Sequence, residues 1–222
     1  MAMKKREIQT PVFFLLGALG LIGLHLEYAV LAVEKLIFSK DYNEFTITES
    51  VTHWIVVCVV WGFIGLIMFY IAARVYGLNI LKKENKPSSR GIIVMVMLLS
   101  SSIGVKYLLL GGWQMAVDFK REGWFQFIFL YIYYLFEAVL LTFGAMFLQE
   151  GCERLIKIKS EYIPWGGTLL ALTWGIIHFL TNFDIKMAIF YTAVAFFIGC
   201  AHLAAHKNLY ISYAFAAILI LI

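Results

Sequence analysis

The chain has 222 residues, of which 62% are hydrophobic and 17% aromatic, and its mean hydropathy is +0.85. These values lie far outside the range of soluble domains, and a net charge of +4 is modest for a nucleic-acid-binding protein. Only three prolines and seventeen glycines accompany the apolar runs, which favours helices over a β-barrel with alternating polar and apolar residues. We therefore predict an all-α polytopic transmembrane helix bundle, a single domain over residues 1–222.

Seven segments of the chain are long enough, or almost long enough, to cross a bilayer, which takes about 20 mainly apolar residues. They are residues 11–37, 51–73, 91–117, 124–156, 164–181, 186–206 and 208–222. The basic residues before the first segment are typical of a signal peptide. However, the apolar stretch runs past Ile37 and has no small-residue cleavage site. We therefore predict that it is retained as the first span.

The basic residues gather in alternate loops. If the N-terminus lies in the cytoplasm, twelve Lys and Arg residues fall on the inner side and five on the outer side, with Lys106 inside a span. The inner twelve are Lys4, Lys5, Arg6, Arg74, Lys82, Lys83, Lys86, Arg90, Arg154, Lys157, Lys159 and Lys207. The positive-inside rule then predicts a multi-pass protein of the cell membrane with a cytoplasmic N-terminus and an outer C-terminus.

Neither the cysteines nor the histidines predict a metal site. Cys58, Cys152 and Cys200 fall in or beside spans without a CxxC spacing, so we interpret them as packing residues. His202 and His206 have the i, i+4 spacing of a metal-binding pair, but no HExxH motif accompanies them. No metal or other cofactor is predicted.

The densest group of charges lies at the end of the fourth segment, in the run that contains Gln149, Glu150, Glu153 and Arg154. Charges near the membrane core cost about 2.5–3.5 kcal/mol each on insertion scales, so they are normally paired, hydrated or functional. Glu150 and Arg154 are spaced i, i+4 and should share a face of the helix, as should Gln149 and Glu153. The group is either a solvated helix end at the cytoplasmic interface or part of a site.

Two short motifs support a site. Glu150-xxx-Arg154, followed on the next helix by Trp174-xxx-His178, resembles the first two motifs of the CAAX protease and bacteriocin-processing family of intramembrane proteases, EExxxR and FxxxH. The resemblance covers about residues 124–222. It implies a water, activated by a glutamate and a histidine, that attacks a peptide carbonyl, while a further His and Asn stabilise the oxyanion.

The chain departs from this family pattern at three positions. Gln149 replaces the first glutamate of EExxxR, and an amide cannot act as a general base. Trp174 replaces Phe, and the third motif, HxxxN or HxxxD, has no clean counterpart. His202-xxx-His206 ends in His, and if the final segment is matched instead, the expected histidine falls near Ala216. The catalytic hypothesis therefore takes Glu150 or Glu153 as the base, with His178 as its partner and His202 as an oxyanion donor. The supporting residues are Gln149, Arg154, Trp174 and Glu137.

Other polar residues lie inside predicted spans. Glu137 is near the middle of the fourth segment, and we expect it to be protonated, to face water or to pair with a cation such as Lys106. His25 and Glu27 on the first segment are interpreted as polar contacts between helices, or alternatively as part of a proton path. Glu34 is expected at the outer interface.

Three functions remain open from the sequence. The first is a divergent peptidase that hydrolyses a membrane-bound or prenylated peptide and affects bacteriocin immunity. The second is an inactive relative that binds lipid, peptide or a membrane protein partner in a regulatory role. The third is a proton-coupled carrier that uses Glu137, Lys106 and Glu27. No nucleic-acid partner is predicted.

Overall fold

The computed structural model describes residues 9–81, 86–182 and 185–222. Every regular element over these ranges is a helix, which confirms the predicted all-α class. Five helices are long and apolar enough to cross a membrane, and two shorter apolar stretches accompany them. Part of the charge count on which the predicted topology depends falls outside the described residues, namely Lys4, Lys5, Arg6, Lys82 and Lys83.

The long elements are α1 (Thr10–Phe38), α2 (Ile47–Tyr70) with its π-helical extension η2 (Ile71–Val75), α3 (Ser89–Leu110), α4 (Gln114–Ile156) and α7 (Ile185–Ala204). The shorter ones are η1 (Tyr42–Glu44), α5 (Trp165–Leu170), η3 (Ala171–Gly175), α6 (Ile176–Asn182) and α8 (Leu209–Leu221). The stretch from α5 through η3 to α6 is one return path after α4, with a π-helical turn in its middle.

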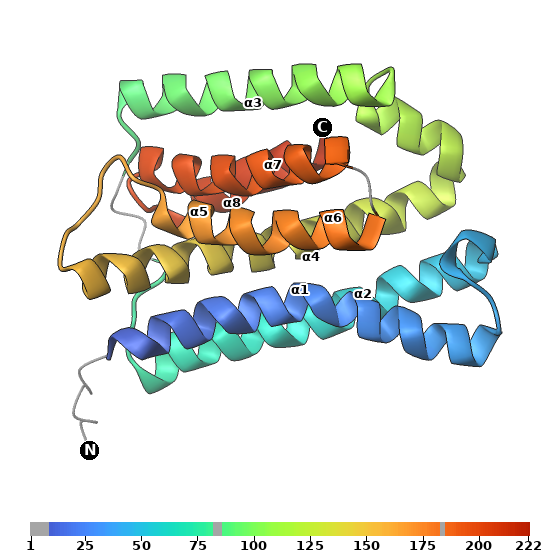
Figure 1. Ribbon diagram of the computed structural model, residues 1–222, viewed down its shortest axis with the longest axis horizontal. Helices are drawn as coiled ribbons and strands as arrows, with labels where there is room; N and C mark the ends of the chain where they lie inside the picture. The colour runs from blue at the N-terminus through green and yellow to red at the C-terminus, as the bar shows by residue number, and fades with distance from the viewer. Residues whose placement is uncertain (1–8, 82–85, 183–184) are drawn as a thin grey trace.

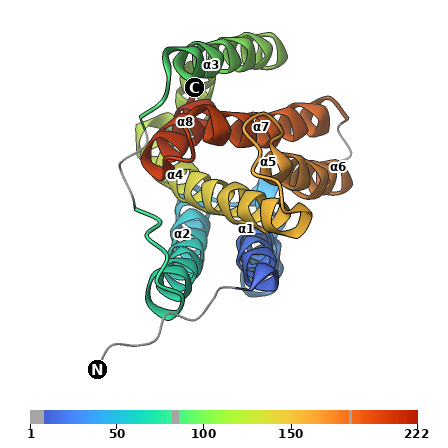
Figure 2. The same cartoon turned by 90° about the vertical axis from the view of Figure 1, so that its left-hand side faces the viewer.

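The helices form two groups that share α4. On one side of α4 lie α1 and α2, and on the other lie α5, α7 and α8, with α3 outermost (Figures 1 and 2). The helix α4 contacts α1, α2, α5, α7 and α8 along its length. Any space between the two groups is therefore bounded by α4 along one wall.

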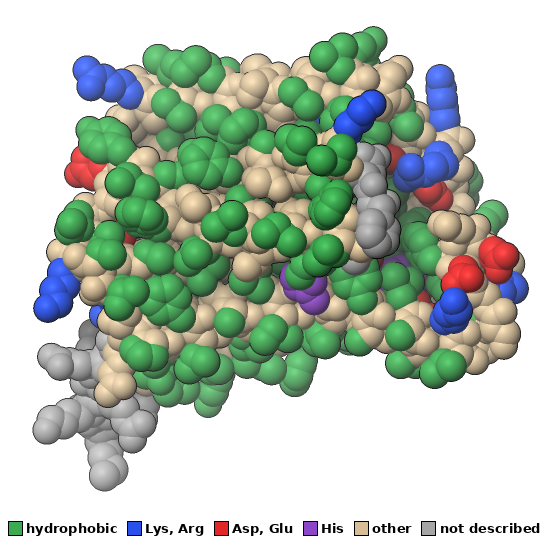
Figure 3. Space-filling model, in the orientation of Figure 1, with side chains coloured by type: hydrophobic (Ala, Val, Ile, Leu, Met, Phe, Trp, Pro, Cys, Tyr) green, Lys and Arg blue, Asp and Glu red, His purple; other side chains and the backbone are tan. Residues whose placement is uncertain are grey.

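The surface agrees with a bundle that lies in lipid. Figure 3 shows Lys, Arg, Asp and Glu side chains gathered at the two ends of the helices, with mainly hydrophobic side chains across the face between them. On α2, Val59, Phe63 and Leu66 are each at least 65% exposed. An apolar band of this kind is costly in water and is what the hydrocarbon core of a bilayer stabilises.

Two glycines alter the third and fourth predicted segments. The third helix ends at Leu110 and not at residue 117, because Gly111 takes a left-handed conformation (φ 69°) that caps it. The next helix begins at Gln114, ten residues before the predicted start, and Gly123 (φ 73°, ψ 171°) interrupts it. The nine residues before Gly123 therefore form a short arm that changes direction before the long part of α4, as the bend at the right of Figure 1 shows.

Candidate functional site

The position of the return path beside α4 is fixed by a close contact between backbones. A Cβ atom at Gly166 would lie 2.0 Å from the Ala145 carbonyl oxygen, so only glycine allows this approach. The Gly166 amide also donates to Gln149 Oε1 at 2.9 Å. The two helices are antiparallel, so twelve residues back from Gln149 and twelve forward from Gly166 reach the same level. Those residues are Glu137 and His178.

The structure does not bring His178 to Glu150. The path from Gly166 to His178 is about 18 Å at 1.5 Å per residue, and it leads away from the end of α4 that carries Glu150. His178 instead stacks on Tyr191 of α7, with ring centroids 4.0 Å apart, and Trp174 meets it edge-on at 4.7 Å. The two motifs behind the family resemblance thus lie at different levels of the bundle.

Gln149 and Glu153 form a buried polar cluster at the end of α4, and they are only 2% and 5% exposed. Gln149 Nε2 donates to Glu153 Oε1 at 2.7 Å and to the Ile163 carbonyl at 3.2 Å. Lys207, in the turn between α7 and α8, donates to Glu153 Oε2 at 2.5 Å. Gln149 therefore ties α4 to the return path, and Glu153 has its charge neutralised by Lys207.

Glu150 and Arg154 lie on another face of the same helix end. Arg154 Nε donates to Glu150 Oε1 at 2.6 Å, which confirms the predicted i, i+4 ion pair. Both side chains are more than one-third exposed, and the guanidinium lies 4.4 Å from the ring centroid of Phe13. This arrangement agrees with the solvated helix end considered from the sequence.

Arg154→Met should therefore change stability little. An exposed i, i+4 ion pair contributes about 0.5 kcal/mol, and methionine can retain the apolar contact with Phe13. We expect a shift of at most a few degrees in the midpoint of thermal unfolding in detergent. A fall larger than about 10 °C would show that the pair is a structural or functional centre.

His202 is bonded within the pair of helices α7 and α8. It is 2% exposed, and its Nδ1 lies 2.9 Å from Ser212 Oγ. Because the Ser212 hydroxyl donates to the Asn208 carbonyl at 2.8 Å, its oxygen is the acceptor for His202. This contact joins α7 to α8. His206, its i+4 neighbour in sequence, lies in the turn after α7 with a positive φ of 52°.

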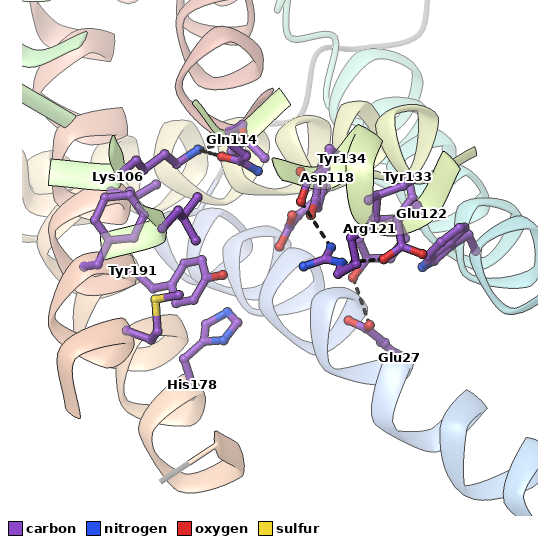
Figure 4. Close-up of a pocket in the computed structure, with 18 of the residues that line it drawn as sticks. Glu27, Lys106, Gln114, Asp118, Arg121, Glu122, Tyr133, Tyr134, His178 and Tyr191 are labelled. Carbon is purple, nitrogen blue, oxygen red and sulfur yellow. Dashed lines mark hydrogen bonds and ion pairs between the residues drawn. The ribbon is translucent and has the colours of Figure 1, made fainter. Parts of the chain in front are cut away.

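A cavity of about 680 Å³ lies between the two helix groups. Its charged and titratable lining comes from several helices and includes Glu27, Lys106, Asp118, Arg121, Glu122, Glu137 and His178. Its aromatic lining includes Tyr42, Trp54, Tyr133, Tyr134, Trp174, Phe190 and Tyr191. Figure 4 shows Lys106, Asp118, Arg121, His178 and Tyr191 around one space, which they reach from different helices.

A second cavity of about 230 Å³ adjoins the first, between α1 and the return path. It is lined by His25, Tyr28, Trp61 and Ile177, among others. Glu27, Tyr133, Glu137, Trp174 and His178 line both cavities. These five side chains therefore form part of the boundary between the two spaces.

Lys106 does not form the ion pair with Glu137 that the sequence suggested. Its Nζ donates to the carbonyls of Leu219 and Ile220 at 2.9 and 2.8 Å, and it also donates to Gln114 Oε1. The last carbonyls of a helix have no intrahelical partner, so a cation is stabilised there. Lys106 thus caps the C-terminal end of α8.

The arm before Gly123 supplies the second cation of the cavity together with two carboxylates. Arg121 donates to Asp118 Oδ1 at 3.1 Å and to Glu122 Oε1 at 2.6 Å (Figure 4). Over the described ranges, neither Glu27 nor Glu137 forms a salt bridge with Lys or Arg. The cavity therefore retains two carboxylates without a Lys or Arg partner beside its aromatic wall.

The sequence did not identify His53 as a site residue, and it did not predict the contact that His53 makes with Glu34. The Glu34 side chain is only 5% exposed, and its Oε2 lies 2.7 Å from His53 Nδ1. His53 stands at the start of the apolar run of α2, directly after Thr52. No motif surrounds it, so no pattern along the chain assigns it a partner.

Comparison with protein-family models, with curated proteins and with solved structures finds no match to this chain. Within the part of the chain that the structure describes, no three His, Cys, Asp or Glu side chains are grouped as metal ligands would be. The candidate site is therefore defined by the geometry and charge of the cavity.

Proposed function

We propose that the chain is a multi-pass protein of the cell membrane that binds a hydrophobic organic cation in the 680 Å³ cavity without cleaving it. The observation that carries the proposal is the pair Glu27 and Glu137. Both line the cavity, and over the described residues neither forms a salt bridge with Lys or Arg; the basic group nearest to Glu27 is the His53 imidazole, at 3.6 Å. This function is a more specific form of the binding role that the sequence left open as the alternative to hydrolysis.

The charge of the cavity favours a cation. Four carboxylates face it, whereas the two basic side chains that line it are engaged, Lys106 by the end of α8 and Arg121 by two of the carboxylates. Two unit charges 4 Å apart interact by about 4 kcal/mol at an effective dielectric constant of about 20, so a cation beside Glu27 or Glu137 would be stabilised appreciably.

The walls and the size favour a hydrophobic ligand. Trp174, Tyr133 and Tyr191 present aromatic rings, which attract cations by about 0.5–2 kcal/mol each where water is excluded. Cavities of about 300–1,000 Å³ that combine apolar walls with a few polar groups are the usual sites of small molecules. A cationic peptide segment or lipid-like amphiphile has the same chemistry, and the proposal covers them as the same class.

The separation of the motif residues supports binding over hydrolysis. Glu150 and Glu153 are neutralised at the end of α4, His202 is bonded between α7 and α8, and His178 lies in the cavity. If the protein does hydrolyse a peptide, Glu27 and Glu137 are the carboxylates that share both cavities with His178. A peptidase assay of Glu137→Gln and His178→Gln would test that alternative.

Binding of tetraphenylphosphonium to the purified protein in lipid nanodiscs tests the proposal. We expect saturable binding of this cation and at least about tenfold weaker binding of tetraphenylborate, which has nearly the same shape and the opposite charge. Glu27→Gln and Glu137→Gln should each weaken cation binding about tenfold, which corresponds to about 1.4 kcal/mol.

Glu150→Gln is the matched control, because Glu150 is a carboxylate of the same helix as Glu137 that lies outside the cavity and pairs with Arg154. It should leave the affinity unchanged. Equal binding of the two probes, or the same affinity in all three variants, would contradict the proposal.

A further inference from the structure

A series of polar side chains connects the cavity to the buried interior between α1 and α2. Tyr133 donates to Glu27 Oε1 at 2.8 Å, and the same oxygen lies 3.6 Å from His53 Nε2. The other ring nitrogen of His53, Nδ1, lies 2.7 Å from Glu34 Oε2. Glu34, His53, Glu27 and Tyr133 therefore form one continuous chain of titratable groups, and it ends in the cavity wall.

Because these side chains are buried, an unbalanced charge on any of them is energetically costly. His53 is 1% exposed and Glu34 5% exposed. Glu34 Oε1 is buried and has no hydrogen-bond partner in the described part of the chain. A buried carboxylate with an unsatisfied oxygen is costly when ionised, whereas a proton shared with the neighbouring imidazole reduces that cost. The geometry thus favours a proton held between the two carboxylates and His53.

The groups that face His53 come from three elements. Glu27 and Glu34 belong to α1, and Tyr42 of η1 meets the imidazole edge-on at 5.3 Å. Burial raises the pKa of Tyr42 above its usual value, so the phenol stays neutral at ordinary pH. From α4, Tyr133 reaches Glu27, and Arg121 and Glu122 line the same cavity as Tyr42. The exchangeable proton near His53 therefore belongs to the imidazole and the two carboxylates.

We propose that Glu34, His53 and Glu27 form a proton-binding site that is coupled to the cavity, so that binding of one organic cation releases one proton. The inference depends on the proposed function, because it assigns a regulation to the same site. In the empty state the site holds one proton more than in the loaded state. When a cation settles beside Glu27, its positive charge replaces that of the proton, which leaves His53 for solvent by way of the cavity that Glu27 lines.

The coupling has a defined sign and size. A ligand that displaces one proton binds more tightly as pH rises, by about tenfold per pH unit where the site is protonated when empty and unprotonated when loaded. Within the range of steepest dependence, about two pH units wide, we expect the dissociation constant of tetraphenylphosphonium to fall by about 100-fold. A pH-indicator dye in weakly buffered solution should report about one proton released per cation bound.

His53→Gln is the variant that isolates the proton site, because glutamine can replace hydrogen bonds but does not titrate. It should still bind tetraphenylphosphonium, with proton release below one-half per cation and a nearly flat pH dependence. His25→Gln is the matched control. His25 is another histidine beside the smaller cavity, its Nδ1 lies 2.5 Å from the Leu21 carbonyl, and the variant should keep the wild-type slope.

The outcomes separate this inference from the proposed function. Binding without proton release in the wild type, or a full slope retained in His53→Gln, would overturn the coupling and leave cation binding in place. Absence of tetraphenylphosphonium binding at every pH would overturn both. If His53→Gln does not fold, Glu34→Gln carries the same expectation, and the dye measurement on the wild-type protein decides without any variant.

Discussion

Gly166→Ala should disrupt the packing of the return path against α4. The added Cβ would lie 2.0 Å from the Ala145 carbonyl oxygen and 2.8 Å from the Gln149 amide nitrogen, both backbone atoms that cannot rotate away. The helices must separate, which lengthens the 2.9 Å hydrogen bond from Gly166 to Gln149. We expect a loss of more than about 4 kcal/mol in the free energy of unfolding, at the upper end for one substitution.

Thermal unfolding in detergent and tetraphenylphosphonium binding would measure this effect. Binding should be lost with stability, because the same contact sets the level of His178 in the cavity. Gly104→Ala is the control: this glycine of α3 has no atom within 4 Å of the methyl group that alanine would add, so the change should stabilise the helix by about 0.5–1 kcal/mol. A variant at Gly166 as stable as the one at Gly104 would contradict the observed helix contact.

The composition was sufficient to predict the helical class, because apolar runs of about 20 residues can satisfy their backbone groups in lipid only as helices. The residues at which the helices begin and end were harder to predict. Gly111 and Gly123 terminate or redirect helices through positive φ angles. Gly111 lies in an apolar run, where no local signal separates this role from packing, whereas Gly123 follows charged residues that favour a loop. The arm that carries Asp118 and Arg121 was therefore divided between a span and a loop.

The site was predicted less well than the fold. The spacing of two residues along the chain does not determine whether they lie at the same height along the axes of neighbouring helices. The number of residues between Glu150 and His178 allows contact only if the two helices turn back symmetrically about the connecting loop. Gly166 instead packs beside Ala145, so the return path begins well before the C-terminal end of α4. It therefore carries His178 to the level of Glu137. The cavity itself depends on pairs such as Glu34 and His53, which are joined by tertiary contact alone.

Gln149→Glu is the second substitution with a large expected effect, and it separates the two views of the end of α4. If the family resemblance determined function, this change would restore the first glutamate of EExxxR and should raise peptide hydrolysis. In the structure it removes the donor to Glu153 and Ile163 and places a second carboxylate beside Glu153, with Lys207 as their cation. We expect a loss of about 2–4 kcal/mol in stability and no gain in hydrolysis.

Acid should reduce this loss, because a protonated carboxyl group regains a hydrogen-bond donor and carries no charge. The difference in unfolding midpoint between Gln149→Glu and the wild type should therefore be smaller at about pH 5 than at about pH 8. Gln126→Glu makes the same chemical change on the same helix at a half-exposed position of the cavity wall, and its stability should stay within about 1 kcal/mol of wild type. A stable Gln149→Glu variant that cleaves peptides would instead place a catalytic centre at the end of α4, because only a site that tolerates and uses the new carboxylate could give both results.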